Sequence, residues 1–130
     1  MRIGLIGFGR TGKAVASVLL ASEKCSLMWV YRQKTLLEKR RVAEYLGIEN
    51  DAEGEVYSSS NTSIDELLDN HPVDIIIDFS SATGIYAYGE AAAKRRIKII
   101  SAISHYSEKE KMFLSELAKT TTVFWSPNIT

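Results

Sequence analysis

The sequence is poor in the residues from which disulfides, metal sites and membrane spans are built. Its 130 residues include one cysteine and two histidines. The single cysteine, Cys25, cannot form an intrachain disulfide, which suits a reducing compartment. One cysteine and two histidines at unsuitable spacing are also too few for a metal site. Because no apolar run approaches the roughly 20 residues of a spanning helix, we expect no contact with the membrane interior.

Neither sign of charge is in excess, since sixteen Lys and Arg balance sixteen Asp and Glu. A chain without surplus positive charge is not generally attracted to nucleic acid or to an anionic membrane, so we expect neither as a partner. The first residues resemble a strand rather than a secretory signal, which indicates a cytoplasmic protein. No Ser, His and Asp arrangement has a physical basis as a catalytic triad, and we assign no catalytic residue.

Strand and helix patterns alternate along the chain. Apolar, β-branched runs predict strands at 2–6, 26–31, 55–58, 73–79, 97–102 and 121–125. Apolar residues at helical spacing and two capping boxes, Ser63/Glu66 and Ser107/Glu110, predict helices at 11–22, 36–46, 65–70, 82–96 and 107–119. This alternation favours a parallel sheet covered by helices on both faces. We therefore predict one α/β domain over residues 1–130, a Rossmann-type doubly wound parallel sheet.

Two predicted helices carry clusters of positive charge. The helix at 36–46 is expected to have a basic outer face formed by Lys39, Arg40 and Arg41. The helix at 82–96 ends in Lys94, Arg95 and Arg96, and cations in a last turn are favoured by the negative end of the helix dipole.

A glycine-rich loop, Gly7-Phe8-Gly9-Arg10-Thr11-Gly12, joins the first strand to the first helix. Gly7 allows a tight turn, Gly9 lets a diphosphate approach the backbone, and Gly12 lets the helix pack against the sheet. The free N–H groups at the start of the helix attract an anion. This context predicts a dinucleotide-binding loop, with an ordinary glycine turn as the alternative.

The end of the second strand indicates which dinucleotide is bound. An NAD site places an acid about 20 residues past the loop, but residues 30–34 contain none. Arg32, supported by Lys34, can instead bind a 2′-phosphate, while Arg10 and Lys13 add positive charge near the diphosphate. We therefore expect NADP(H) to be preferred, with NAD(H) possible. A solvated basic loop is the alternative interpretation.

Three segments resemble the N-terminal domain of bacterial dihydrodipicolinate reductase, an enzyme of lysine and diaminopimelate synthesis. They are Gly9-Arg10-Thr11-Gly12, Asp78-Phe79-Ser80 and Ser126-Pro127-Asn128-Ile129-Thr130. The resemblance covers nearly the whole chain and implies hydride transfer from a reduced nicotinamide to a cyclic unsaturated dicarboxylate. It also implies that Phe79 and Ser80 lie by the ribose and diphosphate, and residues 126–129 near the nicotinamide.

The complete set of expected cofactor contacts combines the loop, the strand ends and the resemblance. These contacts are Gly7, Phe8, Gly9, Arg10, Thr11, Gly12, Arg32, Phe79, Ser80, Ala102, Ser104, Ser126, Asn128 and Ile129.

The sequence departs from the family pattern in two ways. Where the family has Gly-Thr-Thr-Gly beside the nicotinamide and substrate, this chain has Ala102-Ile103-Ser104-His105. Nothing corresponds to the C-terminal domain that carries substrate-binding and oligomer contacts. We therefore expect the chain alone to be inactive, acting with a missing C-terminal domain or as a homo-oligomer. The alternatives are a stand-alone nucleotide-binding or regulatory module and the cofactor domain of another amino-acid dehydrogenase.

Overall fold

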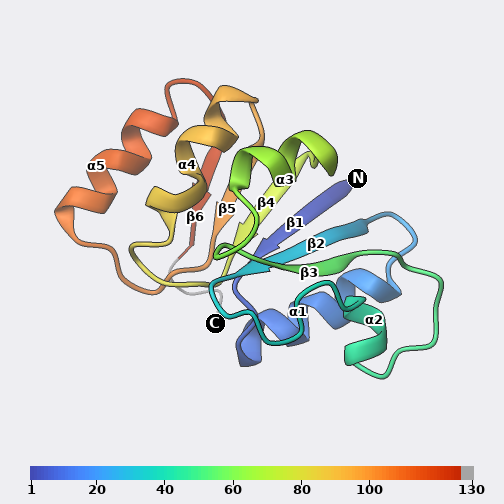
Figure 1. Ribbon diagram of the computed structural model, residues 1–130. Coiled ribbons are helices and arrows are strands. Elements are labelled where there is room, and N and C mark those ends of the chain that lie inside the picture. Colours follow the sequence, from blue (N-terminus) through green and yellow to red (C-terminus); the bar gives the residue numbers. More distant parts are fainter. Residues whose placement is uncertain (127–130) are drawn as a thin grey trace.

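The computed structural model describes residues 1–126 and contains one all-parallel, six-stranded sheet (Figure 1). The strand order is β3-β2-β1-β4-β5-β6. The strands are β1 (Arg2–Ile6), β2 (Ser26–Arg32), β3 (Glu55–Ser58), β4 (Ile75–Asp78), β5 (Lys98–Ser101) and β6 (Val123–Trp125). The helices are α1 (Arg10–Ala21), α2 (Val42–Tyr45), α3 (Ile64–Asn70), α4 (Ile85–Lys94) and α5 (Glu108–Leu117). The predicted α/β Rossmann-type fold is confirmed.

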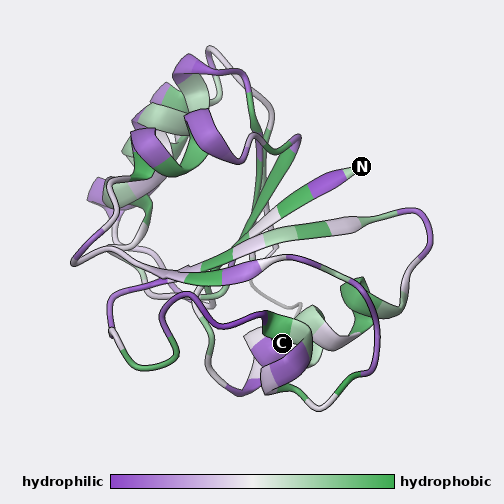
Figure 2. Ribbon diagram, turned by 45° about the vertical axis from the view of Figure 1, so that its right-hand side comes forward, coloured by the Kyte–Doolittle hydropathy of each residue, from purple (hydrophilic) through white to green (hydrophobic). Residues whose placement is uncertain are grey.

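Helices cover both faces of the sheet. Helices α1 and α2 lie on one face, and α3, α4 and α5 lie on the other (Figure 1). The first face buries Leu5, Val30 and Val56 against α1 and α2, and the second buries Trp29, Ile76 and other residues against α3 to α5. Figure 2 shows central strands that are largely hydrophobic and helices that alternate between hydrophobic and hydrophilic residues, as expected of a sheet covered on both faces. The apolar segment at 73–79 is thus a central strand, as predicted.

The predicted helix at 36–46 is wrong except for its last turn. Residues 36–39 form turns, and Leu37 and Lys39 have positive φ values of 72° and 68°. The Lys39 N–H donates to the Val56 carbonyl (2.7 Å), and the Val56 N–H donates to the Arg40 carbonyl (2.9 Å). The backbone groups that a helix would satisfy internally are bound instead by the edge of β3. The basic side chains at 39–41 therefore do not form a helical face.

The other helices agree with prediction apart from shifts at their ends. Ser63 accepts the Glu66 N–H (3.1 Å), and the Ser107 N–H donates to the Glu110 carboxylate (3.2 Å), so both predicted capping pairs form. Helix α4 is shorter at both ends than predicted. None of the helices in residues 1–126 is long and apolar enough to cross a membrane.

The topology defines where a ligand would bind. From β1 the chain adds strands first on one side, as β2 and β3, and then on the other, as β4 to β6. All carboxyl ends of the strands lie at one edge of the sheet because every neighbouring pair is parallel. In open α/β sheets, ligands bind at this edge, where the strand order reverses. Here the reversal lies between β1 and β4.

Candidate functional site

The loop between β1 and α1 packs against the segment that follows β4. Gly7 has a φ of +93°, and a Cβ there would lie 3.0 Å from the Phe79 carbonyl carbon and from the Ser80 Cα. A Cβ at Gly12 would lie 3.0 Å from the Gly7 carbonyl oxygen. A Cβ at Gly9 would meet no heavy atom within 4 Å. Gly7 and Gly12 are therefore needed for packing, whereas Gly9 leaves open space above the backbone.

This open space lies at the N-terminus of α1. Gly9 is the N-cap residue of that helix, so no side chain caps its first N–H groups, and the first turn contains no acid. The partial positive charge of a helix N-terminus is thus available to an external anion. The geometry at Gly9 fits a phosphate or diphosphate.

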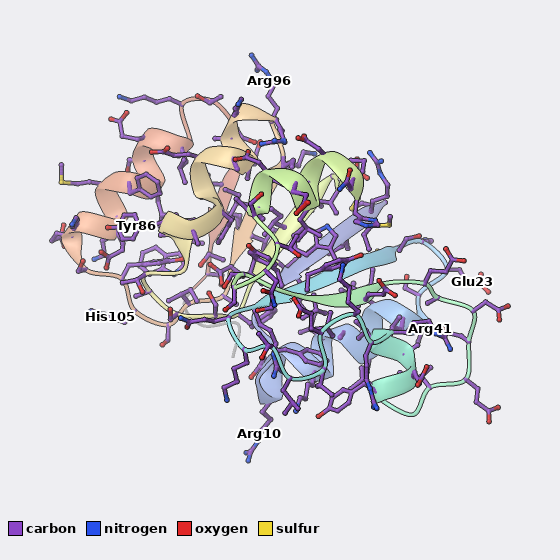
Figure 3. All side chains as sticks on the ribbon, in the orientation of Figure 1. Arg10, Glu23, Arg41, Tyr86, Arg96 and His105 are labelled. Atoms are coloured by element: carbon purple, nitrogen blue, oxygen red, sulfur yellow. The ribbon has the colours of Figure 1, made fainter. Side chains whose placement is uncertain are left out.

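The side chains of the loop differ in what they can contact. The Phe8 ring is buried in the core 5.7 Å from the Tyr45 ring, so only its backbone can face a ligand. Arg10 is exposed and points away from the fold (Figure 3), and Thr11 is also exposed. The Lys13 ammonium donates to the Tyr45 hydroxyl (3.2 Å) and lies 5.6 Å from the Phe8 ring centre. Lys13 is therefore held by two aromatic side chains within the protein.

Arg32, at the end of β2, has an unsatisfied donor. Its Nε is the one buried side-chain nitrogen or oxygen in residues 1–126 that has no hydrogen-bond partner. The acid nearest in sequence after the strand, Glu38, is bound by the Asn61 amide (2.9 Å). Lys34 is exposed. Since no salt bridge among residues 1–126 involves Arg32 and its Nε has no internal partner, its guanidinium is not committed to another group of the protein.

Asp78 ends β4 and is fully buried. Its carboxylate accepts the N–H (2.8 Å) and hydroxyl (2.6 Å) of Ser80 and the hydroxyl of Tyr88 (2.7 Å). Burial raises the pKa of Asp78 above its usual range, and these hydrogen bonds partly offset the rise. Nearby, the Ser101 and Tyr106 hydroxyls are hydrogen-bonded (2.6 Å), and burial raises the pKa of Tyr106 to about 12.

A shallow depression of about 290 Å³ brings three of the loops at the carboxyl edge together. Thr11 comes from α1, Phe79 and Ser80 follow β4, and Ala102, Ser104 and His105 follow β5. Two larger hollows of about 760 and 850 Å³ lie at the amino ends of the strands. We favour the carboxyl edge despite its smaller volume, because the glycine loop and the helix N-terminus lie there.

The expected contact residues within 1–126 lie at the carboxyl edge of the sheet. The Ser126 N–H donates to the Ser101 carbonyl (3.1 Å), which places Ser126 beside the end of β5. Asn128 and Ile129 lie outside the described residues. Within residues 1–126, no group of three or more His, Cys, Asp or Glu side chains is arranged to hold a metal ion.

Two features of this edge were not predicted from the sequence. Asp78 was not among the expected site residues, although an acid inside an otherwise apolar strand is a signal of a buried polar contact. The aromatic contacts of Lys13 depend on Tyr45, 32 residues further along the chain, and no local pattern reveals them.

Comparisons with known proteins agree with the resemblance seen in the sequence. Residues 1–129 match the family described as dihydrodipicolinate reductase, N-terminus. The 4-hydroxy-tetrahydrodipicolinate reductase of Oleidesulfovibrio alaskensis is 25% identical over 121 residues, which are 93% of this chain and 42% of that protein. The Bdellovibrio bacteriovorus enzyme of the same name is 25% identical over 130 residues, 99% of this chain and 44% of that protein. The chain spans less than half the length of these relatives.

Solved structures share the fold. Dipicolinate-bound dihydrodipicolinate reductase from Paenisporosarcina sp. TG-14 superposes with a TM-score of 0.73 at 14% identity, covering 98% of this chain and 47% of that one. A hyperthermophilic archaeal homoserine dehydrogenase in complex with NADPH has a TM-score of 0.64 at 22% identity, covering 97% of this chain and 43% of that one. From the family match over nearly all its residues, the chain belongs to the family of dihydrodipicolinate reductase N-terminal domains.

Proposed function

We propose that this chain is the NADP(H)-binding domain of a dihydrodipicolinate-reductase-like oxidoreductase. In such an enzyme a bound reduced nicotinamide supplies a hydride to a cyclic unsaturated dicarboxylate, and the protein supplies position and electrostatics. The names of the curated relatives support this reaction class. We further propose that these 130 residues do not catalyse the reaction alone and act with a second domain or as a homo-oligomer.

The residues of the carboxyl edge have separate roles in this proposal. The backbone around Gly9 and the N-terminus of α1 bind the diphosphate, and exposed Arg10 adds positive charge. Arg32 binds the 2′-phosphate of the adenosine ribose. The depression formed by Thr11, Ser80 and Ser104 receives the nicotinamide half. A dinucleotide would then extend across the point between β1 and β4 where the strand order reverses.

The Arg32 guanidinium, which ends β2 and has an Nε without a partner inside the protein, carries the proposed preference for NADP(H). A charge-assisted hydrogen bond to phosphate is worth roughly 1.5–3 kcal/mol, and exposure of the adenosine end favours the lower value. Since about 1.4 kcal/mol is one decade in affinity, NADPH should bind about tenfold tighter than NADH. The preference should decrease with salt, because exposed charges are screened.

Calorimetric titration of NADPH and NADH into wild type and Arg32→Ala tests this proposal. We expect the affinity ratio to fall from about ten to about one in Arg32→Ala. Arg96→Ala is the matched control, because Arg96 is an exposed arginine at the opposite end of the sheet (Figure 3). A wild-type ratio near one, or a ratio that survives Arg32→Ala, would remove Arg32 from the site.

A further inference from the structure

A buried carboxylate accepts the hydroxyl of Ser80, a residue that is exposed at the carboxyl edge. Asp78 Oδ1 accepts both the N–H and the Oγ–H of Ser80, and Asp78 Oδ2 accepts the hydroxyl of the buried Tyr88. No salt bridge among residues 1–126 involves Asp78. Three hydrogen bonds therefore take the place of a cation in stabilising this carboxylate.

The hydrogen-bond pattern determines the direction in which the Ser80 hydroxyl points. A backbone N–H can only donate, so Asp78 Oδ1, which accepts the Ser80 N–H, is an unprotonated oxygen. The Ser80 hydroxyl lies 2.6 Å from that same oxygen and must donate its single hydrogen to it. Only the lone pairs of Ser80 Oγ remain for a ligand. Ser80 can accept a hydrogen bond from outside but cannot donate one.

Two glycines keep this hydroxyl in place next to the dinucleotide loop. A Cβ at Gly84 would overlap Ser80 Oγ, so the glycine before α4 provides the space for the Ser80 side chain. The Ser80 Cα lies against Gly7, two residues before Gly9. Ser80 follows β4, whereas Arg32 is the last residue of β2, so the two residues lie on opposite sides of the glycine loop. Ser80 thus lies on the nicotinamide side of the diphosphate.

We propose that Asp78 is a positioning residue that holds the Ser80 hydroxyl as an acceptor, so that Ser80 binds a hydroxyl of the nicotinamide ribose rather than a phosphate. Phosphate oxygens at neutral pH are acceptors and would face another acceptor here, whereas a ribose hydroxyl can donate. This inference rests on the proposed function, because it requires that a dinucleotide occupies the carboxyl edge.

The first test compares two ligands that differ in the nicotinamide riboside, which includes the ribose. NADPH contains it, and 2′-phosphoadenosine 5′-diphosphate has the adenosine half and both phosphates without it. We expect Ser80→Ala to weaken NADPH roughly fivefold, as loss of one neutral hydrogen bond would, and to leave the diphosphate fragment unchanged. Ser115→Ala, on the exposed surface of α5, is the control and should change neither affinity.

The second test removes the carboxylate together with the buried Tyr88 hydroxyl that donates to it, so that only the Ser80 N–H and hydroxyl lose their acceptor. Asp78→Leu combined with Tyr88→Phe replaces both buried partners of that hydrogen bond by apolar groups, which limits the loss of stability to that from the two Ser80 donors. The Ser80 hydroxyl is then free to rotate, so NADPH affinity should fall roughly as far as in Ser80→Ala. Adding Ser80→Ala to this variant should weaken NADPH no further, since Asp78 acts through Ser80. Asp78→Asn keeps an acceptor toward Ser80 and should retain NADPH affinity within about twofold.

The outcomes separate this inference from the proposed function. Three outcomes would overturn the role of Asp78 and leave the proposed function standing. They are equal weakening of both ligands in Ser80→Ala, additive losses in the combined variant, and loss of NADPH affinity in Asp78→Asn. Failure of the wild-type chain to bind either ligand would overturn the proposed function and this inference with it. Circular dichroism of each variant establishes that the comparison is between folded proteins.

Discussion

The three glycines of the loop between β1 and α1 have different neighbours, so their substitution separates ligand binding from stability. Gly9 has open space at its Cβ position and a φ of −81°, which any residue adopts. We expect Gly9→Val to keep the melting temperature of wild type and to lose NADPH affinity by about tenfold or more, because the valine side chain would occupy the diphosphate space. Calorimetric titration and thermal unfolding measure the two effects.

Gly12→Val is the matched comparison. Its Cβ would lie 3.0 Å from the Gly7 carbonyl oxygen, so we expect it to destabilise the fold by about 1–3 kcal/mol. A folded Gly9→Val protein that binds NADPH as wild type does would show that the diphosphate is not bound at this loop.

At this scale, sequence spacing predicted backbone roles better than side-chain contacts. The positive φ of Gly7 agrees with the tight turn predicted from the motif, and Gly12 lets the first turn of α1 lie close to the Gly7 carbonyl. The contact of Lys13 with Tyr45 and the bonds of Asp78 to Tyr88 join elements that are apart in the sequence. Such pairs depend on how helices lie on the sheet, which composition and periodicity do not specify.

Helices α3 and α4 are joined by one arginine. Arg95 forms salt bridges with Asp65 (2.8 Å) and Asp69 (3.0 Å) and donates to the Ala91 carbonyl (3.0 Å). Both acids are largely exposed, so we expect Arg95→Ala to lower the free energy of unfolding by only about 1 kcal/mol. The loss should shrink at high salt, which screens exposed pairs. Urea unfolding of both proteins at low and high salt measures this.

The neighbouring arginine provides the control. Arg96 is exposed and forms no salt bridge in the part of the chain that the structure describes, so Arg96→Ala should leave stability nearly unchanged. Equal losses in the two variants would show that the bridges to α3 contribute nothing measurable.

Helices whose backbone groups are bound within the same turn were predictable from the sequence. The segment at 36–41, whose backbone groups bind a strand distant in the sequence, was not. The capping pairs Ser63/Glu66 and Ser107/Glu110 form because both partners lie in the same turn. Segment 36–41 has helical spacing, but Lys39 and Val42 donate to the carbonyls of Val56 and Gly54. An edge strand thus competes successfully with a short helix, which has little stability of its own.

For the whole molecule, Asp78 links stability to pH. Burial raises the pKa of this carboxyl in the folded protein, so the folded state binds a proton there more tightly than the unfolded state does. Its contribution to stability is present below the usual aspartate pKa and declines as the pH rises through the folded pKa. Asp78→Asn cannot titrate. We therefore expect the stability of Asp78→Asn relative to wild type to increase from about pH 4 to pH 7.

Urea unfolding at several pH values checks this difference. Comparing variant with wild type cancels the other carboxyls, such as Asp74, whose pKa the hydrogen bonds from Arg2 lower. A difference that is constant or that decreases with pH would show that the folded protein does not resist ionisation of Asp78.

Whether the chain can bind the cofactor without catalysing the reaction also depends on the whole molecule. Alignments over 121 and 130 residues of this chain cover 42% and 44% of two reductases. A Rossmann domain can bind and orient a dinucleotide, but the reaction also needs groups that bind the substrate and stabilise the transition state. We expect the purified 130-residue chain to bind NADPH and to show no measurable oxidation of it with 4-hydroxy-tetrahydrodipicolinate.

Absorbance of NADPH at saturating cofactor measures turnover, and the full-length Bdellovibrio bacteriovorus reductase serves as the positive control. The binding titration on the same preparation is essential, because an unfolded chain would also be inactive. A chain that binds NADPH and does not oxidise it would place the substrate-binding groups outside these residues. Robust turnover would place catalytic groups within the chain, and the depression containing Ser104 and His105 would be the first place to look, because it adjoins the proposed nicotinamide position.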